Sequence, residues 1–377
     1  MSFTHEMASG YWEGIRYPIS SLGIDSNDRW KGFTVRDEPV SDPLDPHVPD
    51  RKGALMRPAG VTVHMHLVLG ATGGIGHWTA VKLVERGEPV RVLVRDPERF
   101  RRSWPEAKGV DVVAGDALVA EDVLRAAQGA TTIFHGVNVP YPEWAAKANP
   151  MLANTVSAAQ TVGARVVFPG NVYVFGHARA EWVREDHPME PHTRKGRLRL
   201  QMERHLEELH RTEGLAFTIV RMPDFYGPFV VNRLYADIFR NALRGRSMPW
   251  YGDLDVPSEF LFIPDGGEAM VRAGMDPSSD GETYHVPGAG VTSPREFLGL
   301  VAQAAGSKSR PRAIPGWLLA LVGIANPEAR EFREMMYLKR ERFILDGSKF
   351  RQKFGVVPST PYTTGVHETL DWFRAHP

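Results

Sequence analysis

Four closely spaced glycines constrain the fold of this chain more than any other feature. They stand at positions 70, 73, 74 and 76, directly after the apolar run His66–Leu69 and before a helical pattern of apolar residues. A glycine turn between a strand and a helix suits the diphosphate of a dinucleotide, because the backbone can approach closely and the helix N-terminus is electropositive. The stretch 65–76 therefore predicts a dinucleotide site, against the alternative of a glycine-rich loop that binds nothing.

Strand-like and helix-like patterns alternate from residue 65 onward. Strands are expected at 66–69, 89–94, 110–114, 131–135, 165–168 and 217–221, and helices at 120–127, 149–161 and 195–212. This alternation predicts an α/β fold, a Rossmann-type doubly wound parallel sheet with helices on both faces. Ligands of such sheets lie beyond the carboxyl ends of the strands, so the loops that follow these strands should share one crevice.

Residues 1–64 differ from the rest of the chain. Prolines and acidic residues cluster there without sustained apolar periodicity, which predicts an extended or disordered arm. Two interpretations stay open for this arm. Either translation starts further along, near Met65, or the arm wraps a partner subunit through Tyr11, Trp12 and Trp30.

The remaining chain is expected to form two parts. The dinucleotide-binding domain spans 65–229, with 260–290 returning to it, and a smaller helix-rich substrate-binding cap comprises 230–259 and 291–377. The apolar run Ile314–Ala325 is too short to cross a bilayer and is expected to be a buried helix.

Charge and composition exclude several functions. The 377 residues carry 45 acidic and 45 basic side chains, which gives no electrostatic reason to bind nucleic acid or a membrane surface. The chain has no cysteine, so it can form neither disulfides nor thiolate metal sites, and its histidines do not follow a metal-binding spacing. We therefore expect no metal site. We also expect a cytoplasmic protein, because no signal-peptide pattern precedes the first strand.

Five ordered motifs resemble the extended short-chain dehydrogenase/reductase family, the group that contains nucleotide-sugar epimerases and dehydratases. They are Gly70–Gly76, Gly115-Asp116, Val174–Gly176, Arg221–Pro228 and Phe262–Asp265. The resemblance covers about residues 65–377. It implies a Rossmann fold, a bound NAD or NADP, a small-molecule substrate and a homodimer.

The sequence departs from this family at the catalytic positions. The family uses a serine or threonine after the fifth strand, then a tyrosine and a lysine four residues apart on the next helix. The corresponding residues here are Asn171, Lys195 and Arg199, and Glu203 supports this alignment of the helix. The family's tyrosine exchanges a proton with a substrate hydroxyl or carbonyl, so another group must do this here.

Lys195 is the first candidate for that proton transfer. Arg199 lies one helical turn away, and its like charge should lower the pKa of Lys195. Asn171 could donate a hydrogen bond to a carbonyl oxygen, while Arg199 could hold the ribose. Tyr173, Tyr141 and Tyr226 are substitute acids, although aromatic residues at strand ends more often pack between a sheet and its cap.

The cofactor is expected to be NADP, with NAD as the alternative. Arg95 follows the second strand, where NAD-binding sheets carry an acid, and it could meet a 2′-phosphate. Asp96 comes one position later and could reach the ribose instead. The other expected cofactor contacts are Gly70, Thr72, Gly73, Gly74, Ile75, Gly76, Asp116, Ala117, Gly136, Arg199 and Pro223.

Three functions are compatible with these residues. The favoured hypothesis is an NADPH-dependent oxidoreductase that reduces a carbonyl or an activated double bond of a small organic substrate. A catalytically silent protein that senses NADP(H) and signals to a partner is the second. A nucleotide-sugar epimerase or dehydratase is the third, and it requires a tyrosine as acid and base.

Overall fold

The computed structural model describes residues 64–231 and 233–376. The N-terminal arm expected at 1–64 therefore lies outside the described residues, apart from His64. The two interpretations of that arm, a later translation start and an arm that wraps a partner subunit, therefore also concern residues outside the described ranges.

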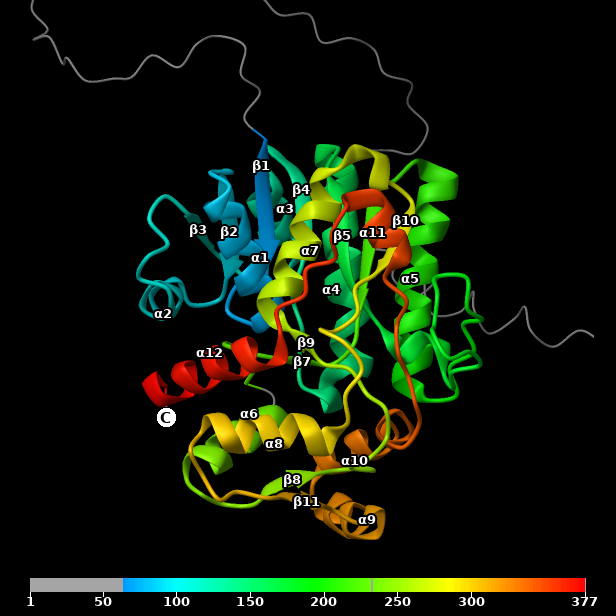
Figure 1. Cartoon of the computed structure of the whole chain (residues 1–377). Helices are drawn as coiled ribbons and strands as arrows, with labels where there is room; N and C mark the ends of the chain where they lie inside the picture. The colour runs from blue at the N-terminus through cyan, green and yellow to red at the C-terminus, as the bar shows by residue number, and fades with distance from the viewer. Residues whose placement is uncertain (1–63, 232, 377) are drawn as a thin grey trace, which may run out of the picture. The chain divides into compact units, whose positions relative to one another are not determined.

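A seven-stranded sheet forms the centre of the described chain, in the order β10-β6-β5-β4-β1-β2-β3 (Figure 1). Neighbouring strands of this sheet run parallel. The strands are β1 (Met65–Leu69), β2 (Val90–Val94), β3 (Asp111–Ala114), β4 (Ala130–His135), β5 (Arg165–Asn171), β6 (Phe217–Met222) and β10 (Glu282–His285). The predicted Rossmann-type α/β fold is confirmed.

Both faces of the sheet are buried, which explains why its strands read as continuous apolar runs. Side chains alternate between two cores, because successive residues of a strand point to opposite faces. Leu67, Ile133 and Val166 belong to one core, whereas their neighbours Val68, Phe134 and Val167 belong to the other. The first core is covered by α3 (Ala120–Ala127), α4 (Trp144–Val162) and α5 (Arg194–Glu213), and the second by α1 (Gly74–Glu85) and α7 (Ile263–Met275).

Several element boundaries differ from the expected ones. The helix α4 begins at Trp144 instead of residue 149, and β5 continues to Asn171. Within the segment 260–290, Leu261–Phe262 (β9) forms a short strand that pairs with β7 (Phe225–Tyr226). The helix α7 begins directly after it, because Pro264 suits the first turn of a helix.

A smaller lobe surrounds a separate aromatic core, which includes Tyr226, Trp250 and Phe297. It contains α6 (Arg233–Leu243), α8 (Pro294–Ala304), α9 (Gly316–Ala325), α10 (Pro327–Arg333), α12 (Tyr362–Ala375) and the parallel pair β8 (Met248–Trp250) and β11 (Pro311–Ala313). The expected cap is interrupted by α11 (Ser348–Phe354), which returns to the main sheet. There Phe350 packs edge-to-face on Tyr284 of β10.

The expectation that the apolar run 314–325 would be buried is wrong for one face of α9. Trp317, Leu321 and Ile324 are 66%, 56% and 78% exposed, whereas Leu319 is buried. An all-apolar helix gives no periodicity from which its two faces could be told apart. Within the described ranges, no helix is long and apolar enough to cross a membrane.

A buried ion pair joins α5 to the strand beside it. Glu203 accepts a hydrogen bond from Nη2 of Arg221 on β6, and both side chains are at most 2% exposed. Arg221 also donates through Nε to the carbonyl oxygen of Asn171 (3.2 Å) and through Nη1 to Nε2 of His285 (3.2 Å). Burial lowers the pKa of His285, so its neutral ring can accept this bond. One guanidinium therefore connects the carboxyl ends of β5, β6 and β10.

We expect Glu203→Ala to lower the free energy of unfolding by about 3–5 kcal/mol, because it leaves the Arg221 guanidinium buried without its counter-ion. Urea denaturation measures this change. Glu207→Ala, on the same helix, is the matched control, since its pair with Arg204 lies at the surface and should change stability by less than about 1 kcal/mol. Equal effects of the two substitutions would contradict the role of the buried pair.

Candidate functional site

Two of the four glycines in the turn, Gly70 and Gly76, leave no room for a larger side chain. Gly70 has a φ of +78°, and a Cβ atom there would lie 2.5 Å from the carbonyl oxygen of Gly136. A Cβ atom on Gly76 would lie 2.3 Å from the carbonyl oxygen of Gly70. The β1–α1 turn therefore packs directly on the loop after β4. Because α1 begins at Gly74 without a side-chain cap, its N-terminus fits the diphosphate of a dinucleotide.

The end of β2 presents arginines to solvent. Arg95 and Arg99 are exposed, while the carboxylate of Asp96 accepts a hydrogen bond from the backbone N–H of Arg99 (2.9 Å). Asp96 is thus the N-cap of α2 (Pro97–Ser103). Arg91, in contrast, pairs with Asp111 at 2.6 Å, so it serves the edge of the sheet.

The loop after β3 is also fixed by hydrogen bonds. The carboxylate of Asp116 accepts the backbone N–H of Leu118 at 3.0 Å. Nδ2 of Asn154 donates to the carbonyl oxygen of Ala117, also at 3.0 Å. Asp116 and Ala117 therefore have a defined position beside the end of β2.

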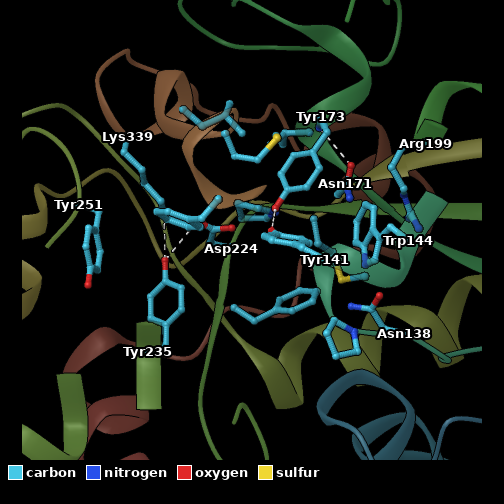
Figure 2. Close-up of a pocket in the computed structure, with 18 of the residues that line it drawn as sticks. Asn138, Tyr141, Trp144, Asn171, Tyr173, Arg199, Asp224, Tyr235, Tyr251 and Lys339 are labelled. Atoms are coloured by element: carbon cyan, nitrogen blue, oxygen red, sulfur yellow. Dashed lines mark hydrogen bonds and ion pairs between the residues drawn. The ribbon is translucent and has the colours of Figure 1, made fainter. Parts of the chain in front are cut away.

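A cavity of about 590 Å³ lies beyond the carboxyl ends of β4, β5 and β6, between the sheet and the cap. Seven residues expected at the site contribute to its wall, namely Ile75, Gly136, Tyr141, Asn171, Tyr173, Arg199 and Pro223. Figure 2 shows the polar side chains among them, together with cap residues that the motifs did not indicate. Of the predicted crevice, the cavity thus includes the loops after β4, β5 and β6, whereas no described residue of the loops after β2 and β3 lines it.

Two tyrosine hydroxyls meet in this wall. Oη of Tyr141 and Oη of Tyr173 are 2.7 Å apart (Figure 2). Tyr173 follows the end of β5, where its backbone N–H donates to Oδ1 of Asn171 (3.1 Å). Burial raises the pKa of both tyrosines above the usual value, so both hydroxyls are protonated at neutral pH.

Arg199 forms the wall beside these tyrosines. Its guanidinium lies 4.4 Å from the ring centre of Phe168 and 5.9 Å from that of Trp144. One terminal nitrogen donates to the carbonyl oxygen of Pro169, whereas the buried Nε finds no hydrogen-bond partner in the described part of the chain. Burial lowers the pKa of Arg199 to about 10, which still leaves it charged at neutral pH.

Lys195 does not belong to the residues that line the cavity. Its ammonium is 2.5 Å from Oε2 of Glu331 and 2.8 Å from Oε1 of Glu334, and the side chain is 3% exposed. It also lies 5.0 Å from the ring centre of Tyr141. Lys195 therefore ties the first turn of α5 to the cap segment that carries α10, and the structure does not bring it together with Asn171 and Tyr173.

The motifs did not indicate a second polar group in the wall. Lys339 forms an ion pair with Asp224, and the hydroxyl of Tyr235 donates to Oδ2 of Asp224 at 3.2 Å. The ammonium of Lys339 also lies 4.8 Å from the ring centre of Trp250. Asp224 stands within the motif Arg221–Pro228, but nothing in the local sequence marks Lys339.

Tyr226, the third substitute acid, lies outside the cavity. Its side chain is fully buried in the aromatic core of the smaller lobe, with its ring centre 5.0 Å from that of Phe297. It therefore packs beneath the cap, as is typical of aromatic residues at strand ends.

A family model supports the assignment that the motifs suggested. Residues 66–286 match the NAD dependent epimerase/dehydratase family. The chain belongs to this family, within the extended short-chain dehydrogenases and reductases.

Individual relatives share at most moderate sequence identity with this chain. The chain is 24% identical to a UDP-N-acetyl-alpha-D-glucosaminuronate decarboxylase of Bacillus cytotoxicus over 325 residues, which cover 82% of this chain and 97% of the relative. It is 30% identical to a dTDP-glucose 4,6-dehydratase of Streptomyces antibioticus over 169 residues, which cover 44% of each chain. The match to that dehydratase thus spans less than half of its length.

Solved structures with similarly low sequence identity share the fold of this chain. A dTDP-glucose 4,6-dehydratase from Streptomyces venezuelae, solved with NAD, aligns with a TM-score of 0.67 and 22% identity over 82% of this chain and 97% of that chain. The UDP-glucose 4-epimerase of Thermus thermophilus, in complex with NAD, aligns with a TM-score of 0.68 and 21% identity over 83% of this chain and all of the epimerase. At these identities the likeness establishes the fold.

We expect Lys195→Ala to lower the free energy of unfolding by about 2–4 kcal/mol, because Glu331 and Glu334 lose the buried cation between them. Arg194→Ala is the matched control, since Arg194 pairs with the same two glutamates but is 71% exposed, and it should cost less than about 1 kcal/mol. Urea denaturation measures both changes. A Lys195→Ala protein with unchanged stability and no turnover would instead support a catalytic role for Lys195.

Proposed function

We propose that the protein is an NADPH-dependent oxidoreductase that reduces a carbonyl group of a small organic substrate, with Tyr173 as the proton donor. The hydroxyl pair of Tyr141 and Tyr173 in the cavity wall carries this proposal. The pair stands at the strand ends and shares the cavity wall with Gly136 and Pro223, two of the expected cofactor contacts. A bound NADPH would supply a hydride to the carbonyl carbon.

Carbonyl reduction needs a group that carries a proton, and both hydroxyls of the pair are protonated at neutral pH. A protonated tyrosine can donate a proton to a carbonyl oxygen that gains electrons, whereas the reverse reaction needs a base that removes a proton from a hydroxyl. Tyr173 would give its proton to the oxygen and recover one from solvent through the hydroxyl of Tyr141, 2.7 Å away. Asn171 is bound to Tyr173 through Oδ1, so its Nδ2 group is directed to donate elsewhere and can hold the same carbonyl oxygen.

Arg199 would stabilise the charge that develops during this step. It stays protonated at neutral pH and cannot serve as the acid. Its side chain lines the cavity, where a ribose hydroxyl or an anionic oxygen could accept a hydrogen bond from the guanidinium. Under these roles Lys195 acts on the site only through the position of Tyr141 and the cap.

The arginines at the end of β2 support NADP as the cofactor. Since Asp96 uses its carboxylate to cap α2, it is less able to accept a ribose hydroxyl, and Arg95 is exposed beside it. A guanidinium suits a 2′-phosphate, because it can donate two parallel hydrogen bonds to phosphate oxygens. The two solved relatives described above contain NAD, so cofactor choice would differ from theirs.

A nucleotide-sugar epimerase or dehydratase is the second candidate, and the names of the relatives favour it. Such chemistry would need a tyrosine that loses its proton to accept one from a sugar hydroxyl. Burial of Tyr141 and Tyr173 opposes that loss. A protein that binds NADPH but converts no carbonyl compound would support the sensing function instead.

We expect Tyr173→Phe to lower kcat for carbonyl reduction by about 100-fold or more, because the substrate oxygen loses its proton donor. NADPH oxidation followed by absorbance measures the rate, and a binding titration should show that the affinity for NADPH changes little. Tyr226→Phe is the matched control, since this tyrosine lies outside the cavity. Full turnover by Tyr173→Phe would contradict the proposed role.

We expect Arg95→Ala to weaken NADPH binding about tenfold and to leave NADH binding unchanged, because only NADPH carries the 2′-phosphate. Calorimetric titration with each dinucleotide measures the two affinities. Arg102→Ala is the control, since Arg102 lies on the neighbouring helix and faces Glu98 at 3.9 Å. An equal loss for both dinucleotides after Arg95→Ala would argue against selection by Arg95.

A further inference from the structure

We propose that the cavity binds an uncharged, mainly apolar carbonyl compound rather than a nucleoside diphosphate sugar, a substrate class that rests on the function proposed above. The charges of the wall, its apolar side chains and the position of its polar groups each support this class. It differs from the nucleotide sugars named in the relatives.

The wall has no surplus of positive charge. Its described charged residues are two cations, Arg199 and Lys339, and two anions, Asp224 and Asp237. The ammonium of Lys339 is already paired with Asp224 and lies 3.3 Å from the hydroxyl of Tyr235. A nucleoside diphosphate carries negative charge on both phosphates, and burying such charge without paired cations is costly. The other wall cation, Arg199, already interacts electrostatically with the buried carboxylate of Glu203.

Apolar side chains form most of the remaining wall. On the sheet side they include Val137, Trp144 and Met222, and the cap adds Leu318, Leu319, Phe332, Met335 and Leu338. Leu319 and Met335 are at most 5% exposed. Transfer of a hydrocarbon or aromatic ring from water into this space is favourable, and it needs no fixed polar partner.

The polar groups stand at two separate places. Figure 2 shows Asn171 and Arg199 on one side of the cavity, with Tyr235, Lys339 and Tyr251 on the other. A carbonyl held by Asn171 and Tyr173 would therefore place the rest of the substrate against apolar wall. Because Asp224 and Lys339 neutralise each other, the side of the cavity that carries Lys339 can bind a neutral hydroxyl or a similar group. This neutralised pair has no net charge with which to bind an ion.

The two faces of α9 provide a test of this substrate class. Leu318 lies in the cavity wall, whereas Leu321, on the same helix, is 56% exposed and is not among the wall residues. The same substitution at both positions adds the same charge to the same helix. Only the change at Leu318 alters the space offered to a ligand.

The experiment compares two probes by calorimetric titration of the full chain with NADP⁺ present, a state in which an aldehyde cannot be reduced. The probes are 2-naphthaldehyde, a neutral bicyclic aldehyde, and UDP-glucose. We expect 2-naphthaldehyde to bind at least tenfold more tightly. Tighter binding of UDP-glucose, or no binding of 2-naphthaldehyde, would overturn the proposed substrate class.

Leu318→Asp should weaken 2-naphthaldehyde binding at least tenfold, and Leu321→Asp should leave it unchanged. Thermal melting of both variants verifies folding, and Leu318→Asn replaces Leu318→Asp if the latter unfolds. Equal affinities of Leu318→Asp and Leu321→Asp for 2-naphthaldehyde would overturn the assignment of this cavity as the binding site.

Binding and turnover separate the two proposals. Tight binding of 2-naphthaldehyde without reduction by NADPH would remove the proposed function and keep the substrate class. Tight binding and turnover of UDP-glucose would remove the substrate class, whatever the rate with aldehydes.

Discussion

The buried ion pair of Glu203 and Arg221 is the interaction on which the position of the site depends. Arg221 binds Glu203 on α5, the carbonyl oxygen of Asn171 at the end of β5, and His285 on β10. Asn171 in turn holds the backbone of Tyr173. A single guanidinium therefore sets the strand ends from which the polar side chains of the cavity project, and its burial makes any loss of a partner expensive.

The proposed chemistry uses a different element from the usual family site. Family members place their tyrosine on the helix that corresponds to α5, whereas Tyr173 follows a strand and meets Tyr141 from the neighbouring loop. Both hydroxyls are buried and protonated. The fold and family membership are compatible with several reactions, and these hydroxyls and the wall around them distinguish one reaction from another.

Local patterns were sufficient for the sheet, because strand and helix periodicity and the glycine turn depend on neighbouring residues. They placed Asn171, Tyr173 and Arg199 in one crevice but could not place Lys195, whose partners Glu331 and Glu334 follow 136 and 139 residues later. Lys339 was missed for the same reason. The exposed face of α9 was missed because its apolar residues have no polar side to orient them.

The ion pairs of Lys195 have a consequence for how this chain could change. Lys195 lies in the first turn of the helix that supplies Arg199 to the cavity, and it holds the cap segment through Glu331 and Glu334. The proposed proton donor stands on a different element, after β5. Mutations in α9 and α10 could therefore reshape the wall around a fixed reacting centre, so that new substrates are acquired through the cap while the hydroxyl pair is retained.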